Sequence, residues 1–295
     1  VSVLSIVEHP SLDALRDGLH DELKDAGYQD GKSLHWAYQS AQGNQGTAVQ
    51  IARKFVGDRP DVIVPIATPA AQAVVSATHQ IPVVYNAITD PIAAQIVKSM
   101  APSGTNVTGV SDKLVADRQV AFIKRVVPDV KRVGIIYSPA EANSVSATRE
   151  MKVALEKQGI SLVEVAAPRS IDVGQAAQRL VGKVDVIYTS NDNNVISAYE
   201  SVIKVANAAK IPLICADRSS VQRGATGAMA IDYYRMGRQT GRMVLRILNG
   251  EKPGDIASET SDRLDITLNL DAARRQGATL SPELQAEASE IFGKP

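Results

Sequence analysis

Residues 61–85 of the chain read DVIVPIATPAAQAVVSATHQIPVVY. Two short apolar runs, Val62–Ile66 and Val83–Tyr85, have the length and composition of buried strands. Between them, Thr68 and Pro69 are typical of the N-cap and the first residue of a helix. A strand, a helix and a second strand in this order predict a βαβ unit, whose two strands lie parallel in one sheet.

The same alternation extends in both directions from this stretch. Val1–Val7 predicts a strand, and the helix after it carries leucines at helical spacing, with Ser11 as its expected N-cap and Gly27 as its end. The pattern starts again near Lys131. We expect further strands at Leu34–Tyr38, Val107–Val110, Val133–Tyr137, Val163–Val165, Val184–Thr189, Leu213–Cys215 and Ile266–Leu270, a long helix over Tyr233–Leu248 and a last helix over Pro282–Phe292.

The two halves of the chain resemble each other. Asp61-Val62-Ile63 leads to Ile81-Pro82-Val83-Val84, and later Asp185-Val186-Ile187 leads to Ile211-Pro212-Leu213-Ile214. Any two βαβ segments can share such punctuation, but the match favours two lobes of the same topology. The expected fold class is α/β, with two Rossmann-like lobes whose parallel sheets are flanked by helices and which are joined by a hinge.

The lobes are expected to be discontinuous in sequence. The N-terminal lobe should comprise residues 1–111 with about 232–265, and the C-terminal lobe residues 112–231 with about 266–295. The chain would then cross between the lobes near Ser111–Lys113, near Ile231–Tyr233 and near Ser261–Ile266. A cleft between two such lobes is the expected place for a small-molecule ligand.

The composition excludes several classes of protein. Lys and Arg together number 32, as do Asp and Glu, so the formal net charge is zero and the basic excess of a nucleic-acid binder is absent. The single cysteine, Cys215, allows neither an internal disulfide nor a cysteine-based zinc cluster. The first residue is Val1 rather than Met, which the removal of an export signal would explain and the choice of an expressed fragment would explain equally well.

Polar residues and helix starts follow most of the predicted strands. In an open parallel sheet these positions meet at the carboxyl edge, where ligands bind. The helix N-termini there can hold a carboxylate, and Asp90, Asp192 and Asp217 could receive an ammonium group, so the pattern suits a zwitterion such as an amino acid. Each such residue taken alone is also a common helix cap, so the argument depends on the loops lying at one edge.

Signatures of catalysis and of cofactor binding are missing from the sequence. There is no G-x-G-x-x-G after the first strand, no P-loop, no G-x-S-x-G and no H-E-x-x-H. We therefore expect no catalytic residue, no cofactor and no metal. Among the four histidines only His9 follows a strand, where it is a candidate ligand contact or hinge residue, and Cys215 is expected to be a buried, inert thiol.

Several stretches resemble a known family. They are His9-Pro10-Ser11-Leu12-Asp13, Ile66-Ala67-Thr68-Pro69-Ala70-Ala71-Gln72, Ala87-Ile88-Thr89-Asp90-Pro91, Asn106-Val107-Thr108-Gly109-Val110-Ser111-Asp112, Tyr137-Ser138, Asn143-Ser144, Asp192-Asn193, and Gly237 with Gly241. In these stretches the chain resembles the substrate-binding proteins of bacterial ABC transporters of the tryptophan-binding type, which have a periplasmic-binding-protein-like type 1 fold. The resemblance extends over nearly the whole chain.

The resemblance implies a periplasmic or extracytoplasmic protein, lipid-anchored or free, with an ABC permease and its ATPase as partners. The expected oligomeric state is a monomer, because a two-lobed clamp can work as one. It implies an aromatic amino acid, Trp, Phe or Tyr, as the ligand. The ligand-binding residues expected on this basis and from the strand ends are His9, Ser11, Leu12, Thr68, Pro69, Ala70, Asp90, Asn143, Ser144, Asp192 and Asp217.

Two departures from the family pattern keep the ligand class open. Thr189-Ser190-Asn191 is more polar than the family pattern before Asp192, and Arg218 is unexpected at its position, so a more polar amino acid or a carboxylate compound remains an alternative. Two other functions also remain: the ligand-sensing core of a transcription regulator, and an α/β enzyme that acts on a small carboxylate, such as an amino-acid racemase. The single cysteine excludes a two-thiol racemase.

Overall fold

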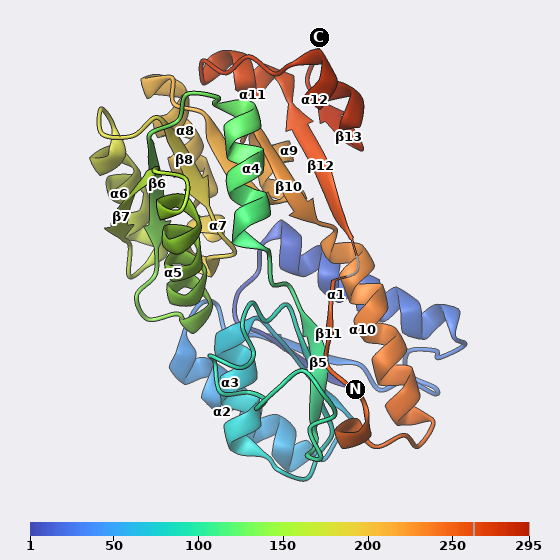
Figure 1. The fold of residues 1–295 in the computed structure, drawn as a ribbon. Helices are drawn as coiled ribbons and strands as arrows, with labels where there is room; N and C mark the ends of the chain where they lie inside the picture. The colour runs from blue at the N-terminus through green and yellow to red at the C-terminus, as the bar shows by residue number, and fades with distance from the viewer. Residues whose placement is uncertain (262, 295) are drawn as a thin grey trace. The chain divides into compact units, whose positions relative to one another are not determined.

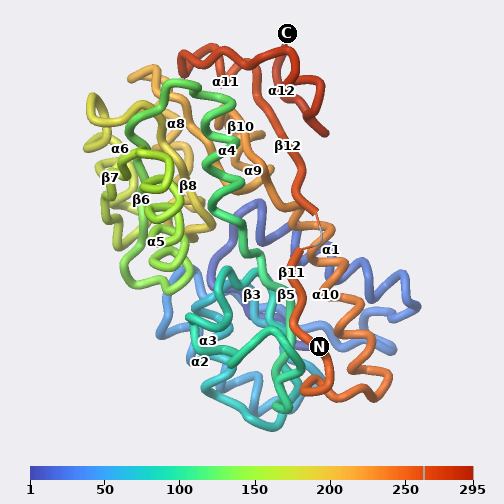
Figure 2. Tube along the Cα trace, in the orientation of Figure 1, coloured from blue at the N-terminus to red at the C-terminus, as the bar shows by residue number. Residues whose placement is uncertain are grey.

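The structure is a computed structural model that describes residues 1–261 and 263–294. The chain forms two compact units, one of Val1–Lys113 with Tyr233–Asp262 and one of Leu114–Asp232 with Arg263–Pro295. Each unit has its own sheet with helices packed against it (Figure 1). The chain therefore passes from one unit to the other three times, and this path can be followed along the trace (Figure 2).

The first unit is built on a six-stranded sheet of order β11-β5-β4-β3-β1-β2, in which every pairing is parallel. Helices α2 and α3 pack together, and so do α1 and α10, with the sheet between the two pairs (Figure 1). The elements are β1 (Ser2–Ser5), α1 (Pro10–Asp25), β2 (Ala37–Ser40), α2 (Gln45–Asp58), β3 (Ile63–Ile66), α3 (Thr68–Ala77), β4 (Val83–Asn86), β5 (Val107–Ser111), α10 (Tyr233–Leu248), the short 3₁₀ turn η2 (Pro253–Asp255) and β11 (Glu259–Thr260).

The second unit has a seven-stranded sheet of order β13-β12-β10-β9-β8-β6-β7. All its pairings are parallel except β10 with β12, which is antiparallel. The elements are α4 (Ala116–Val126), β6 (Arg132–Tyr137), α5 (Ala142–Glu156), β7 (Ser161–Ala166), η1 (Ser170–Asp172), α6 (Val173–Leu180), β8 (Val186–Thr189), α7 (Asn193–Ser197), α8 (Tyr199–Ala209), β9 (Leu213–Asp217), α9 (Arg218–Arg223), β10 (Gly227–Ile231), β12 (Leu264–Asn269), α11 (Leu270–Arg275), α12 (Pro282–Glu287) and β13 (Glu290–Phe292).

The two sheets share one strand order, which confirms that the lobes have the same topology. The run β5-β4-β3-β1-β2 of the first unit corresponds to β10-β9-β8-β6-β7 of the second. In the second unit, neighbouring residues of β6 enter separate hydrophobic clusters, Ile135 with Phe122 and Leu155, and Ile136 with Leu180. Because successive strand residues point to opposite faces, this sheet is covered by apolar side chains on both sides. The predicted α/β fold class is thus confirmed.

Two predicted elements are wrong in their extent. The strand expected at Leu34–Tyr38 begins only at Ala37, because the amide of Leu34 donates to the carbonyl of Gln29 in a turn and is not free to enter the sheet. The helix expected over Pro282–Phe292 ends at Glu287, and the chain continues as β13, which pairs with β12 at the edge of the sheet.

The contact between α1 and α10 brings two helix backbones together. A Cβ atom added to Gly237 would lie 2.0 Å from the carbonyl oxygen of Leu15, and one added to Gly18 would lie 2.1 Å from the carbonyl oxygen of Tyr234. Only glycine allows such an approach, since real Cβ atoms do not come so close to backbone oxygens. The pair anchors the returning segment Tyr233–Asp262 in the first unit.

We expect Gly237→Ala to lower the free energy of unfolding by about 1–3 kcal/mol, because the added methyl group forces the two backbones apart. Urea unfolding measures this loss. Gly57→Ala is the matched control: Gly57 lies near the end of α2 with nothing within 4 Å of an added Cβ, so stability should stay equal or rise by up to about 1 kcal/mol. Equal stability of both variants and the wild type would contradict the close-contact account.

Candidate ligand-binding loops

Backbone strain marks two strand ends of the first unit. Ala67 directly follows β3 and has φ 73° and ψ 156°, and Ala87 directly follows β4 and has φ 56°. Such conformations cost about 1–3 kcal/mol each in residues other than glycine, and they collect at functional sites. Ala67 is also the N-cap of α3. The helix therefore begins at Thr68, one residue earlier than the sequence predicts, and Pro69 is its second residue and not its first.

Buried polar atoms without partners lie at the same strand ends. In the described part of the first unit, the hydroxyl of Thr68 and both side-chain atoms of Asn86 have no hydrogen-bond partner. In the second unit the same holds for Asn143 Oδ1, at the start of α5, and for the hydroxyl of Ser190, directly after β8. A buried polar group without a partner is costly, so a cluster of them at these edges fits groups that a ligand would satisfy.

His9 begins the first helix. Its backbone is extended, and its Nδ1 accepts the amide of Leu12 at 3.5 Å, so His9 and not Ser11 is the N-cap of α1. The prediction of Ser11 as N-cap is wrong because Pro10 is already the first helical residue, a position where its missing amide costs nothing. Ser11 and Leu12 are buried in the first turn.

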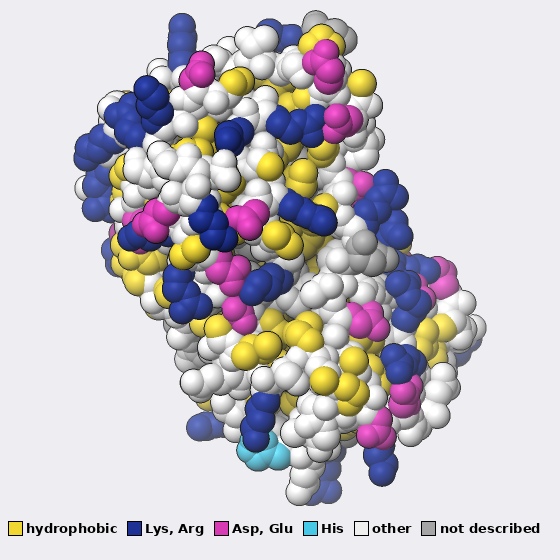
Figure 3. All heavy atoms as spheres, viewed as in Figure 1, with side chains coloured by type: hydrophobic (Ala, Val, Ile, Leu, Met, Phe, Trp, Pro, Cys, Tyr) yellow, Lys and Arg dark blue, Asp and Glu magenta, His cyan; other side chains and the backbone are white. Residues whose placement is uncertain are grey.

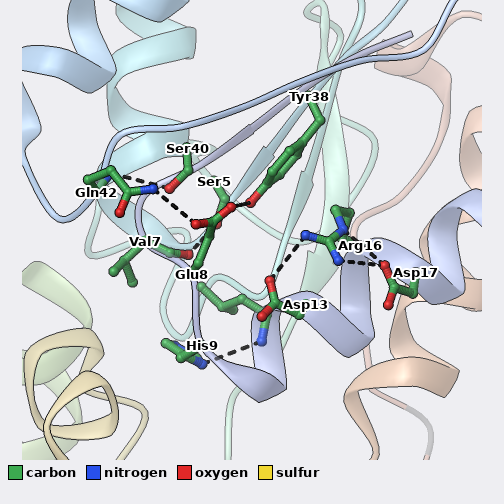
Figure 4. A network of polar contacts seen from close by, with 11 residues as sticks. Ser5, Val7, Glu8, His9, Asp13, Arg16, Asp17, Tyr38, Ser40 and Gln42 are labelled. Carbon is green, nitrogen blue, oxygen red and sulfur yellow. Dashed lines mark hydrogen bonds and ion pairs between the residues drawn. The ribbon is translucent and has the colours of Figure 1, made fainter.

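A polar network next to His9 fixes the loop between β1 and α1 (Figure 4). Glu8 accepts hydrogen bonds from the hydroxyl of Tyr38 at 3.3 Å and from Gln42 Nε2 at 3.0 Å. The guanidinium of Arg16 lies 4.9 Å from the centre of the Tyr38 ring and pairs with Asp13. These contacts tie the loop to β2 and to α1, so His9 is held at a defined position.

Asp90, after β4, is held by the protein itself. Its Oδ1 accepts the amide of Ala93 at 2.9 Å, and its Oδ2 lies 3.6 Å from Lys113 Nζ. Nearby, the carboxylate of Asp112 accepts hydrogen bonds from Thr89 Oγ1 at 2.9 Å and from the hydroxyl of Tyr233 at 2.7 Å. The second of these bonds joins the end of the first segment of the unit to the start of the returning one.

In the second unit, Asp192 joins two loops. One oxygen accepts the amide of Ser138 at 2.7 Å and the hydroxyl of Ser144 at 2.5 Å, and the other accepts the hydroxyl of Ser138 at 3.0 Å and the amide of Val195 at 2.9 Å. Asp192 is thereby the N-cap of α7, and it fixes the loop after β6 to the loop after β8. Burial raises the pKa of its carboxyl group, against the effect of these hydrogen bonds.

Glu141 is a functional candidate that the sequence analysis missed. Its Oε2 accepts hydrogen bonds from Asn193 Nδ2 at 2.7 Å, from Asn143 Nδ2 at 3.1 Å and from the amide of Asn193 at 3.4 Å. Burial, with the nearby charge of Asp192 as a second cause, raises the pKa of Glu141 to about 7. The available signal was a carboxylate two residues before Asn143 in a strand-end loop, which is easily taken for an ordinary helix start.

The two departures from the family pattern, at Arg218 and at Thr189, have partners within the second unit. Asp217 is the N-cap of α9 and accepts the amide of Ser220 at 2.9 Å. Arg218 is directed to β13, where its guanidinium pairs with Glu290 and lies 5.6 Å from the centre of the Phe292 ring. Thr189 is buried and shares a hydrogen bond with the hydroxyl of Tyr199. Arg218 and Thr189 are therefore engaged within the unit.

The structure places every predicted ligand-binding residue at the last position of a strand or in the loop or helix start that follows one. In the first unit these are His9, Ser11 and Leu12 at α1, Thr68, Pro69 and Ala70 at α3, and Asp90 after β4, and in the second they are Asn143 and Ser144 at α5, Asp192 at α7 and Asp217 at α9. The hydroxyl of Ser144 donates directly to Asp192. Asn143 donates to Glu141 and to the carbonyl of Asn191, the neighbour of Asp192, and so binds the same two loops together. Leu12, Pro69 and Ala70 are buried.

Among residues 1–261 and 263–294, no group of three or more His, Cys, Asp or Glu side chains could hold a metal ion. No helix in the same part of the chain is both long and apolar enough to cross a membrane. On the face shown in Figure 3, basic and acidic side chains are interspersed.

Comparison with known proteins identifies the family. The model of the family described as ABC transporter substrate binding protein matches residues 1–292. A curated relative, the tyrosine-binding protein of Clostridioides difficile strain R20291, is 39% identical over 274 residues, which cover 93% of this chain and 79% of that protein. The chain therefore belongs to the ABC transporter substrate binding protein family.

Solved structures agree with this assignment. The crystal structure of a conserved domain protein from Vibrio cholerae O1 biovar El Tor N16961 has a TM-score of 0.96 and 47% identity, covering 98% of each chain. The structure of an ABC domain in complex with L-Trp from Streptococcus pneumonia has a TM-score of 0.95 and 34% identity, covering 99% of this chain and 98% of that one. The family assignment favours a substrate-binding protein over the regulator core and the α/β enzyme.

The raised pKa of Glu141 predicts a pH-dependent stability. Because folding raises this pKa from about 4.5 to about 7, the contribution of Glu141 is fully present below pH 4.5 and is lost as the pH rises through 7. Glu141→Gln keeps a neutral side chain at every pH. We expect the ligand-free variant to match the wild type at pH 4.5 and to exceed its free energy of unfolding by about 3 kcal/mol at pH 8, measured by urea unfolding. A difference that does not change with pH would show that Glu141 is an ordinary solvated carboxylate.

Proposed function

We propose that this ABC transporter substrate-binding protein binds an aromatic amino acid, with Tyr and Trp as the first candidates and Phe as the third. The tyrosine-binding relative and the L-Trp complex support this ligand class. The observation that carries the proposal is the set of buried, unpartnered polar atoms on Thr68, Asn86, Asn143 and Ser190, all at the carboxyl ends of strands. A small zwitterion supplies both donors and acceptors for such groups.

Each unit carries groups that suit one end of an amino acid. In the first unit, the N-terminus of α3 with Thr68 and the strained Ala67 suits a carboxylate. In the second unit, the loops after β6 and β8 carry acidic and amide groups that suit an ammonium group.

The expected affinity follows from simple magnitudes. An aromatic side chain buries roughly 150–250 Å², worth about 4–6 kcal/mol at about 25 cal/mol/Å². Charge-assisted hydrogen bonds to the zwitterion add to this, so binding at about micromolar strength, on the order of 8 kcal/mol, is expected.

The proposed role is binding and delivery without turnover. The one thiol supports this, because Cys215 is fully buried, burial raises its pKa well above the usual value, and it donates to the carbonyl of Asp217. We propose an extracytoplasmic protein that acts as a monomer and hands its ligand to an ABC permease driven by its ATPase. Lipid anchoring of the native precursor is part of the same proposal.

The ligand class is tested by thermal unfolding against the twenty amino acids, after refolding has stripped any bound ligand. A ligand that binds only the folded state raises the midpoint, so we expect a rise of several degrees with Tyr, Trp or Phe and none with the small or charged amino acids. A rise with a polar amino acid alone would replace the aromatic class. A flat response to all twenty would reject amino acids as the ligand.

The unpartnered hydroxyl of Thr68 is tested by Thr68→Val. This variant should be as stable as the wild type or more so, because it removes a buried polar group that lacks a partner, yet it should bind Tyr or Trp at least about tenfold more weakly. Thr78→Val is the matched control. The Thr78 hydroxyl accepts the amides of Gln80 and Ile81 at 3.2 Å, so its loss should lower stability and leave affinity unchanged. Titration calorimetry and urea unfolding separate the two patterns.

A further inference from the structure

Two buried carboxyl groups of the second unit lack a cation. Glu141 and Asp192 are 6% and 0% exposed. Among the ion pairs of the described residues, none joins a Lys, Arg or His to either of them. Burying one carboxylate without a counter-charge is expensive, and placing a second one beside it adds repulsion. A cation supplied by a bound molecule would offset this cost.

The two carboxyl groups have different roles. Both oxygens of Asp192 are occupied, since each accepts two hydrogen bonds from its own loops. Glu141 is occupied on one side only: all three of its hydrogen bonds reach Oε2, and among the described residues none reaches Oε1. Asp192 therefore organises the loops, and Glu141 retains an oxygen for a further donor.

Other unused acceptors lie in the same pair of loops. Asn143 donates both its hydrogen bonds through Nδ2, to Glu141 at 3.1 Å and to the carbonyl of Asn191 at 2.9 Å, and these fix the amide group with Oδ1 unpartnered. The hydroxyl of Ser190 is also unpartnered. Together with Glu141 Oε1 they are three acceptors, and a primary ammonium group carries three N–H donors and one positive charge.

We propose that Glu141 is the counter-charge for the ammonium group of the ligand, with Asn143 and Ser190 as neutral acceptors beside it. This inference rests on the proposed amino-acid function and assigns one of its contacts. The aspartates that the sequence suggested for this role are engaged otherwise: Asp90 faces Lys113, and Asp217 caps α9. Glu141 thereby selects amino acids over the corresponding acids that lack the amine.

Binding should therefore depend on pH. Among residues 1–261 and 263–294, the charged group that faces Glu141 is Asp192, from the loop before α7. The other groups around it are neutral: α5 and α7 contribute the amides of Asn143 and Asn193, and the loop after β6 contributes the hydroxyl of Ser138, which is bonded to Asp192. In the ligand-free protein the pKa of Glu141 is about 7, and a bound ammonium group favours the ionised form. Affinity for the amino acid should rise about tenfold from pH 6 to pH 8.

The test uses L-tyrosine and 3-(4-hydroxyphenyl)propanoate, which has the same ring and carboxylate but no amine. Titration calorimetry at pH 6 and pH 8 is made with the wild type, Glu141→Gln and the control Glu156→Gln, an exposed residue at the end of α5. We expect Glu141→Gln to weaken L-tyrosine binding at least about twentyfold, to remove its pH dependence and to leave propanoate binding unchanged. Glu156→Gln should behave as the wild type.

Each other result has a definite meaning. Equal binding of L-tyrosine by Glu141→Gln and the wild type, or equal weakening of both probes, would overturn the counter-charge and leave the proposed function standing. Equal wild-type affinity for the two probes would do the same. If the wild type binds no amino acid, the proposed function itself fails. Should Glu141→Gln not fold, Glu141→Asp keeps the charge and should still prefer L-tyrosine to the propanoate; loss of that preference would overturn the inference.

Discussion

The close approach of α1 and α10 is the contact on which the architecture depends. At Gly18 and Gly237 two helix backbones meet with no room for a side chain, and this seats a segment from late in the chain in the first unit. Because β11 follows in the same segment and pairs with β5, the sheet of this unit is finished by residues far from its other strands. The three passages of the chain between the units are the direct result.

The ends of several strands in both sheets carry features that lower the stability of the fold. Ala67 and Ala87 adopt backbone conformations that suit glycine, Thr68 and Asn86 bury polar atoms without partners, and Glu141 is a buried carboxyl group beside a second one. Asp192, at another strand end, is instead satisfied from within by four hydrogen bonds. A protein whose task is to hold a small molecule has reason to leave such groups to its ligand, since a site satisfied from within has nothing to offer it.

The sequence predicted the alternating strands, the repeated topology and the loops that hold the candidate residues, because periodicity and helix punctuation are local signals. The sequence-based prediction was wrong where contacts beyond the local pattern determine the bounds of an element. The turn around Gln29 delays β2, the free edge of β12 turns the end of the chain into a strand, and Pro10 moves the cap of α1 from Ser11 to His9. Glu141 was missed because its burial and its partner Asp192 come from loops 51 residues apart, which no local pattern shows.

The interleaved path of the chain also bears on how the protein is made. The first unit takes β11 of its sheet and α10 of its helix layer from residues after 232, which are synthesised late. The second unit takes β12 and β13 of its sheet from residues after 263. During synthesis from the N-terminus, neither unit has all its strands before these late segments have been made. Folding of either unit is thus tied to the synthesis of its late segment, and until then the edge of β5 and the face of α1 that α10 covers stay unpaired.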